Sequence, residues 1–166
     1  IMFADVSNSS ALYKRLGNVD AKRLVDKTLD IMSRLTAEHA GTVVKTIGDE
    51  IMARFDSAGD ACRAAMAIQQ YCSMASGDEA LAVRIGIAYG PTLLDQDDTF
   101  GDTVNDAAFV THIARANQIV LTEGVVNNLD DELRSQCQTF DHVNIKGEVG
   151  HTVIYRLQWE GATHGH

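Results

Sequence analysis

The stretch VVKTIGDEIMA, residues 43–53, places apolar runs on both sides of a Gly-Asp-Glu corner. The two runs are typical of consecutive strands, and Gly48 allows the tight turn that would join them. Lys45 precedes the turn, and the carboxylate of Asp49 lies at its tip. The pattern predicts a β-hairpin that carries a polar site, with a purely structural Gly-Asp turn as the alternative.

Composition narrows the class of protein. The chain has 166 residues, 45% of them apolar, which is enough for one domain with a buried core. It carries 14 basic and 23 acidic residues, and this charge of -9 disfavours a nucleic-acid-binding surface. A nucleotide substrate remains compatible with it, because metal ions can neutralise phosphates locally. No apolar run approaches the roughly 20 residues of a membrane span, and no signal peptide is visible.

The cysteines indicate the redox state of the domain's compartment, and the ends of the sequence indicate the limits of the domain. Cys62, Cys72 and Cys137 form no Cys-x-x-Cys pair, so we expect reduced thiols in a cytoplasmic domain. The sequence is strand-like from residue 1, so we expect a fragment of a longer protein. We predict a folded domain at residues 1–158 and a disordered tail at residues 159–166.

Hydrophobic periodicity gives the order of the elements. They are a strand at 1–6, helical segments from 11 to about 39, strands at 43–47 and 51–55, a helix at 61–72, a strand at 81–88, a polar loop at 95–98, a helix at 104–116, a strand at 119–121, a helical segment at 123–135 and closing strands around a turn at 146–150. The first six follow the order βαββαβ. The order predicts an α+β, ferredoxin-like palm-type core with an extra C-terminal α/β segment.

Two acids are expected to meet in this fold. The first and third strands of a ferredoxin-like sheet are neighbours, so Asp5 at the end of the first strand should lie beside Asp49. Two carboxylates at one edge repel each other unless a cation lies between them. Hard oxygen ligands suit Mg²⁺ or Mn²⁺ shared with phosphates. The alternative is a pair of solvated loop acids.

Five segments recur in order along the chain. They are FADVSNSS at residues 3–10, KTIGD at 45–49, RIGIAYG at 84–90, DTFGDTVN at 98–105 and NIKG at 144–147. Each is a weak motif alone, but in this order and at these separations they resemble the catalytic domain of class III adenylate/guanylate cyclases. The resemblance covers residues 1 to about 157.

The resemblance implies a role for the acids and for two later residues. Asp5 and Asp49, with the backbone carbonyl of Val6, would hold two ions of Mg²⁺ or Mn²⁺. One ion would lower the pKa of the ribose 3′-hydroxyl, and the other would bind the triphosphate. As catalytic residues, Asn105 would orient the ribose and Lys146 would contact phosphate.

The resemblance also implies a substrate and an assembly. Lys45 and Asp98 would read the base, with the lysine donating to a ring nitrogen of adenine and the carboxylate accepting from its 6-amino group. This pair predicts ATP rather than GTP. In the family, acids and base-reading residues come from different subunits, which implies a head-to-tail homodimer. Regulatory or sensor domains would control it, and the chain would contact neither nucleic acid nor membrane.

The chain departs from the family at one functional position. The family carries an arginine four residues after the asparagine, where it stabilises charge on the phosphates, and this chain has Phe109. Arg115 lies six residues past Asn105, about 240° round a helix, so we expect it on another face and do not expect it to substitute.

Three functions follow from these observations. The first is an adenylate cyclase that makes 3′,5′-cyclic AMP and pyrophosphate from ATP. The second, motivated by Phe109, is a degenerate cyclase homology domain that binds nucleotide or dimerises and regulates without efficient turnover. The third is a diguanylate cyclase, which shares a palm-like core, but the hairpin lacks the two glycines and the phenylalanine of that family's signature.

Overall fold

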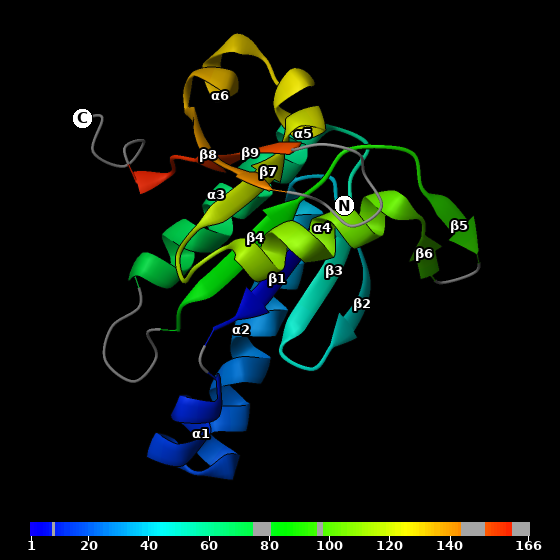
Figure 1. Ribbon diagram of the computed structural model, residues 1–166. Coiled ribbons are helices and arrows are strands. Elements are labelled where there is room, and N and C mark those ends of the chain that lie inside the picture. Colours follow the sequence, from blue (N-terminus) through cyan, green and yellow to red (C-terminus); the bar gives the residue numbers. More distant parts are fainter. Residues whose placement is uncertain (8, 75–80, 96–97, 144–151, 161–166) are drawn as a thin grey trace.

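The computed structural model describes residues 1–7, 9–74, 81–95, 98–143 and 152–160. Its elements, shown in Figure 1, are β1 (Met2–Val6), α1 (Ser9–Leu16), α2 (Asn18–Glu38), β2 (Thr42–Ile47), β3 (Glu50–Arg54), α3 (Ala58–Met74), β4 (Val83–Ile87), β5 (Leu93–Asp95), β6 (Asp98–Phe100), α4 (Asp102–Ile113), β7 (Ile119–Thr122), α5 (Glu123–Asn127), α6 (Asp131–Ser135), β8 (Cys137–Val143) and β9 (Thr152–Leu157).

The described strands form one large sheet and one small one. The seven-stranded sheet has the order β2-β3-β1-β4-β7-β9-β8, and β5 pairs with β6 apart from it. β1 lies between β3 and β4 and is antiparallel to both, whereas β4 and β7 are parallel. This arrangement confirms the βαββαβ core and the neighbouring first and third strands. The strands β7, β9 and β8 extend the sheet beyond the core, as predicted for the C-terminal segment.

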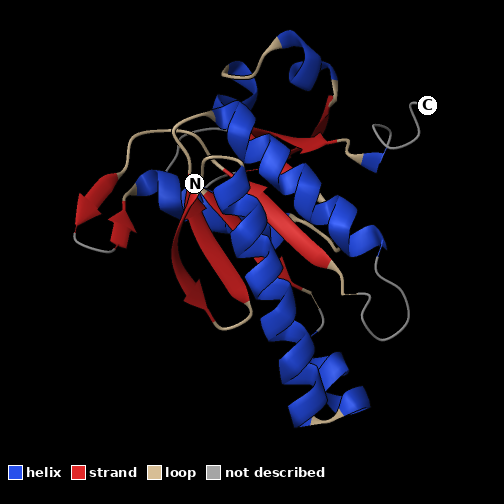
Figure 2. Ribbon diagram, turned by 180° about the vertical axis from the view of Figure 1, so that it is seen from behind, coloured by secondary structure: helices blue, strands red, loops and turns tan. Residues whose placement is uncertain are grey.

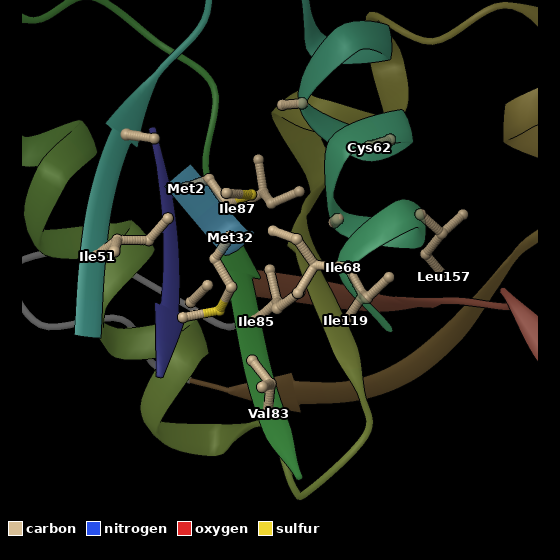
Figure 3. Packing of buried hydrophobic residues seen from close by; sticks show 14 of the residues in the cluster. Met2, Met32, Ile51, Cys62, Ile68, Val83, Ile85, Ile87, Ile119 and Leu157 are labelled. Carbon is tan, nitrogen blue, oxygen red and sulfur yellow. The ribbon is translucent and has the colours of Figure 1, made fainter. Parts of the chain in front are cut away.

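Helices cover both faces of the sheet. α2 and α3 lie on one face (Figure 2), and α4 crosses the other (Figure 1). The larger core cluster joins the sheet to α2 and α3, where side chains such as Met2, Met32, Ile68 and Ile85 interdigitate (Figure 3). α3 presents fully buried alanines to the sheet, which lets the helix backbone lie close to the strands.

Two glycines shape the parts of the fold nearest the predicted site. Gly48 has φ +58° at the β2–β3 turn, a conformation that glycine adopts without steric cost. Gly86 lies on β4 under α4, where an added Cβ would overlap the side chain and backbone of Thr111. Because Gly86 has no side chain, α4 can pack directly on the central strand, and this sets the position of the residues that α4 carries.

Several predicted boundaries were wrong. Asp95 and Asp98, the first and last residues of the polar loop expected at 95–98, are paired positions of β5 and β6, and residues 96–97 lie outside the described residues. α4 begins at Asp102 and ends at Ile113, three residues short of the prediction. The first closing strand is β8. It starts at Cys137, which pairs with Leu157 of β9. The predicted turn at 146–150 and the residues 161–166 of the predicted tail lie outside the described residues.

Two further findings concern the setting of the domain. None of the helices in the described part of the chain combines the length and hydropathy of a transmembrane span. Cys62, Cys72 and Cys137 are free thiols, and burial raises the pKa of Cys62 to about 12 and that of Cys72 to about 11. These two thiols are therefore poor nucleophiles at neutral pH.

Candidate active site

Asp5 and Asp49 converge at one end of the central strands, as the topology predicted. Asp5 is directly opposite Glu50 in the β1–β3 register, and the backbone N–H of Val6 donates to the carbonyl oxygen of Asp49 at 3.0 Å. Both acids line one open cavity of about 920 Å³. We call it the acid cavity; its lining residues are Asp5, Val6, Ser7, Ser9, Ser10, Ala11, Lys14, Asp49, Arg84, Ala114, Arg115 and Ala116.

Arg84 holds the carboxylate of Asp5. Its Nε and Nη2 atoms lie 3.0 and 2.9 Å from Oδ2 of Asp5. The side chains are 30% and 19% exposed, so the pair is largely removed from water. Sequence reasoning assigned no role to Arg84, although the pairing of β1 with β4 places it opposite Asp5. An arginine on the strand next to a candidate metal ligand was therefore the signal that could have found this contact.

Glu50 adds a third acid next to the pair. Burial and the negative charge of Asp5 raise its pKa to about 7, and the nearby guanidinium of Arg84 opposes that rise. A carboxyl group with such a pKa is partly protonated at neutral pH. Glu50 therefore adds only part of a negative charge beside Asp5 at neutral pH.

The acid cavity offers few protein ligands for a metal ion. Across residues 1–7, 9–74, 81–95, 98–143 and 152–160, no three His, Cys, Asp or Glu side chains gather in a metal-binding group. Asp5 and Asp49 supply carboxylate oxygens to the lining of an open space, and Val6 lines it beside them. This donor set fits Mg²⁺ or Mn²⁺, which are commonly bound through one or two carboxylates with substrate phosphates and water completing the shell.

Lys45 and Asp98 meet at a different place. Nζ of Lys45 on β2 lies 3.0 Å from Oδ2 of Asp98 on β6, and their side chains are 42% and 30% exposed. The hydrogen bond from Lys45 and a second one from the backbone N–H of Thr99 hold the pKa of Asp98 below its usual value. Neither residue lines the acid cavity. The chain thus places the predicted base-reading pair and the predicted metal ligands in separate sites.

Asn105 is also absent from the lining of the acid cavity. It is exposed on the first turn of α4. Phe109, one turn further on, is half-buried and packs against the cluster that contains Val110, Val120 and Ile154. Lys146, the remaining predicted site residue, lies outside the described residues.

Arg115 occupies a position that the sequence did not predict. It lies beyond the end of α4, so the reasoning from helix faces does not apply to it. Unlike Asn105, it lines the acid cavity together with Asp5 and Asp49.

The sequence profile of the adenylate and guanylate cyclase catalytic domain matches residues 1–158. This chain belongs to that family. The cyclase domain is 32% identical to an adenylate cyclase of Streptomyces griseus over 121 residues, which cover 73% of this chain and 30% of the relative. It is 30% identical to the putative adenylate cyclase 3 of Rhizobium meliloti over 129 residues, covering 75% and 22%. The cyclase domain thus spans about a third or less of the length of these relatives.

Solved structures bear out the fold of the cyclase domain. An adenylate/guanylate cyclase/hydrolase from Silicibacter pomeroyi superposes with a TM-score of 0.78 at 26% identity, covering 95% of this chain and 94% of the other. The catalytic core of a rhodopsin-guanylyl cyclase with converted specificity, in complex with ATPalphaS, gives a TM-score of 0.83 at 22% identity, covering 95% and 93%. The predicted family and fold class are therefore confirmed.

Proposed function

We propose that this cyclase domain converts ATP to 3′,5′-cyclic AMP and pyrophosphate. The observation that carries the proposal is the convergence of Asp5 and Asp49 on one open cavity of about 920 Å³ that serines and cations also line. Relatives named adenylate cyclase support the choice of ATP. We place the reaction in the cytoplasm, where free thiols persist.

The acids, with the carbonyl of Val6, would hold two divalent cations, Mg²⁺ or Mn²⁺. When bound, these ions supply the charge that lowers the pKa of the ribose 3′-hydroxyl and neutralises the triphosphate. The 3′-hydroxyl releases its proton to water, its oxygen attacks the α-phosphorus to form a new P–O bond, and the bond to the bridging oxygen breaks as pyrophosphate leaves. Asn105 would orient the ribose, and Lys146 would contact phosphate. The chain's own part is to align these groups and to stabilise charge.

Selection of the base would rest on Lys45 and Asp98. The ammonium group donates to a ring nitrogen of adenine, and the carboxylate accepts from the 6-amino group. Guanine presents an oxygen acceptor where adenine presents that amino group, so Asp98 would face it with repulsion. The ion pair seen between Lys45 and Asp98 keeps the two groups close together and charged until a base is bound.

The separation of the two sites supports a shared active site. Lys45, Asp98 and Asn105 are absent from the lining of the acid cavity. One nucleotide would therefore bind the acids of one copy and the base-reading residues of a second. Such a head-to-tail homodimer has two equivalent sites, and regulatory or sensor domains elsewhere in the full-length protein would control how the copies meet.

A turnover assay tests the proposal. ATP and GTP are supplied separately with Mg²⁺ or Mn²⁺ at several protein concentrations. We expect cyclic AMP from ATP, with a rate per subunit that rises as dimers form, and little product from GTP. Asp49→Ala should remove the activity. Equal rates with Asp49→Ala, or no cyclic AMP above background in the unaltered protein, would contradict the proposal.

Phe109 favours a second candidate, a domain that binds nucleotide without efficient turnover. Losing one donor that stabilises transition-state charge typically costs about 10²–10³ in rate. Tight, metal-dependent ATP binding with no turnover would support this alternative. Turnover at ordinary enzymatic rates would exclude it.

A further inference from the structure

The acid cavity contains more positive than negative side chains. Asp5 and Asp49 contribute two carboxylates, and Lys14, Arg84 and Arg115 contribute three cations. This excess is unusual in a chain with 23 acidic and 14 basic residues. Two metal ions would need no such cations, whereas a triphosphate, which carries more negative charge than the two acids, would be stabilised by them.

The three cations are not equivalent. Arg84 is engaged with Asp5 through two contacts near 3 Å. Lys14 on α1 and Arg115 are exposed, and within the described part of the chain neither has a recorded ion pair. Lys14 and Arg115 therefore retain the charge and the hydrogen-bond donors needed to bind a ligand.

The backbone at Arg115 is fixed even though its side chain is exposed. α4 ends at Ile113, and Ala114 turns to an extended conformation with φ −60° and ψ 141°. The N–H of Arg115 then donates to Oε1 of Gln118 at 2.9 Å, and the N–H of Gln118 donates back to the carbonyl of Arg115 at 3.0 Å. These bonds hold residues 115–118 as a compact turn at the edge of the acid cavity.

The same turn is tied to the strand that carries Arg84. The N–H of Asn117 donates to the carbonyl of Val83 at 2.8 Å. Gln69, fully buried on α3, donates to the carbonyls of both Val83 and Gln118 at 2.8 and 3.2 Å. Arg115 is thus presented from a rigid support, which lowers the entropy lost when its guanidinium orders on a ligand.

We propose that Arg115, assisted by Lys14, binds the β- and γ-phosphates of the nucleotide in the acid cavity and stabilises the charge on departing pyrophosphate. This inference rests on the proposed function. The guanidinium comes from the same chain as Asp5 and Asp49, whereas position 109 is on α4 and outside that cavity. Arg115 therefore supplies, from the opposite wall of a shared site, positive charge that Phe109 cannot provide. A planar guanidinium also matches two phosphate oxygens at once.

Direct binding measurements test this independently of turnover. The protein is titrated with inorganic tripolyphosphate, with ATP and with adenosine, each in the presence of Mg²⁺. Arg115→Ala should raise the Kd for tripolyphosphate and ATP roughly 10-fold, the usual size for a hydrogen bond to a charged group, and leave adenosine unchanged. Lys14→Ala combined with Arg115→Ala should raise the Kd further, and Arg115→Lys should retain part of the affinity.

Arg34→Ala is the matched control, because Arg34 is a 68% exposed arginine on α2 that pairs with Glu38 and lies outside the acid cavity. Equal tripolyphosphate affinity in the Arg115→Ala and Arg34→Ala variants would overturn the inference. Equal affinities would refute only the role of Arg115 if the unaltered protein cyclises ATP and Asp49→Ala abolishes this activity, because the proposed function would then stand. Weakened tripolyphosphate binding in Arg115→Ala without any cyclisation by the unaltered protein would refute the proposed reaction and retain the phosphate site.

Discussion

The acid cavity and the Lys45–Asp98 pair are held by different supports. Asp5 lies on β1, between two hydrogen-bonded neighbours, and its side chain is 19% exposed. Lys45 lies on β2, the edge strand of the sheet, and is 42% exposed. Its partner Asp98 is on the β5–β6 hairpin, which extends away from the body of the domain in Figure 1.

The difference indicates which half of the site is complete in one chain. Asp5 sits on the central strand β1, and Asp49 sits in the β2–β3 turn, where its carbonyl accepts from the backbone N–H of Val6. The base-reading pair sits on an exposed edge and on a hairpin with exposed apolar residues, Leu93 at 70% and Phe100 at 48%. An exposed apolar hairpin is typical of a surface that another protein covers. The comparison therefore supports a site that only a second copy completes.

The largest expected effect comes from two variants, one in the acid cavity and one in the Lys45–Asp98 pair, that are assayed alone and mixed. Asp49→Ala should lower turnover by about 10³-fold, since it removes a proposed metal ligand worth several kcal/mol. Lys45→Ala should also lower it, through the other half of the site. A 1:1 mixture should recover about a quarter of full activity, because half the dimers are mixed and each has one intact site. If the activity of the mixture is no higher than the mean activity of the two variants, the two groups of residues do not form a site shared between two copies.

The second effect concerns α4, which joins the two halves. Phe109→Arg should raise the rate about 10²-fold if a cation at this position stabilises the phosphates. It should also lower the melting temperature by a few degrees, since the ring packs against Val110 and Val120. Initial rates and thermal unfolding are measured together, with Ala108→Arg, at an exposed neighbouring position, as control. An unchanged rate with the expected loss of stability would assign Phe109 a packing role alone.

The third effect is confined to the exposed half. Asp98→Asn should reduce the preference for ATP over GTP by about 10-fold, because an amide can donate to the guanine oxygen as well as accept from adenine. Metal dependence should stay the same, since Asp98 does not line the acid cavity. The ratio of kcat/KM for the two nucleotides measures this. A change in the Mg²⁺ requirement with no change in nucleotide preference would show that Asp98 acts on the metal ions and does not select the base.

The two halves also differ in how far the sequence could predict them. The convergence of Asp5 with Asp49 followed from strand order alone, because β1 and β3 had to be neighbours. The resemblance alone implied that Lys45 and Asp98 act together on the base, and no pattern in the sequence predicted their ion pair, since residues 95–98 were interpreted as a loop. Three-residue strands such as β5 and β6 are too short to show a clear alternation of apolar and polar residues.

Arg84 and Arg115 were missed for separate physical reasons. Arg84 contacts Asp5 through the pairing of strands 79 positions apart, a relation that local patterns do not contain. Arg115 was assigned to a helix that in fact ends at Ile113, where the chain turns to meet Val83. That end is set by tertiary hydrogen bonds, and helix boundaries of this kind are the least predictable feature of a sequence.

The smallest expected effect is a pH-dependent change in stability caused by the titration of Glu50 next to the acid cavity. Glu50 has a pKa of about 7 in the folded chain and an ordinary value of 4.5, so its protonated form is favoured by folding. Its contribution to stability is therefore full below pH 4.5 and is lost as the pH rises through about 7. Because the side chain is only half-buried, solvent screening reduces this to about 1 kcal/mol, or roughly 2–4 °C in melting temperature.

Glu50→Gln removes this titration and keeps the shape of the side chain. In metal-free buffer, the unaltered protein should lose that 2–4 °C relative to the variant between pH 5 and pH 8. Mg²⁺ should shrink the difference at pH 8, because a cation beside Asp5 and Asp49 offsets the charge that ionised Glu50 adds. Glu38→Gln, at an exposed position on α2, is the control for a general effect of removing an acid. Parallel melting curves for the unaltered protein and Glu50→Gln at every pH would show that burial and the charge of Asp5 do not raise the pKa of Glu50 in the folded chain.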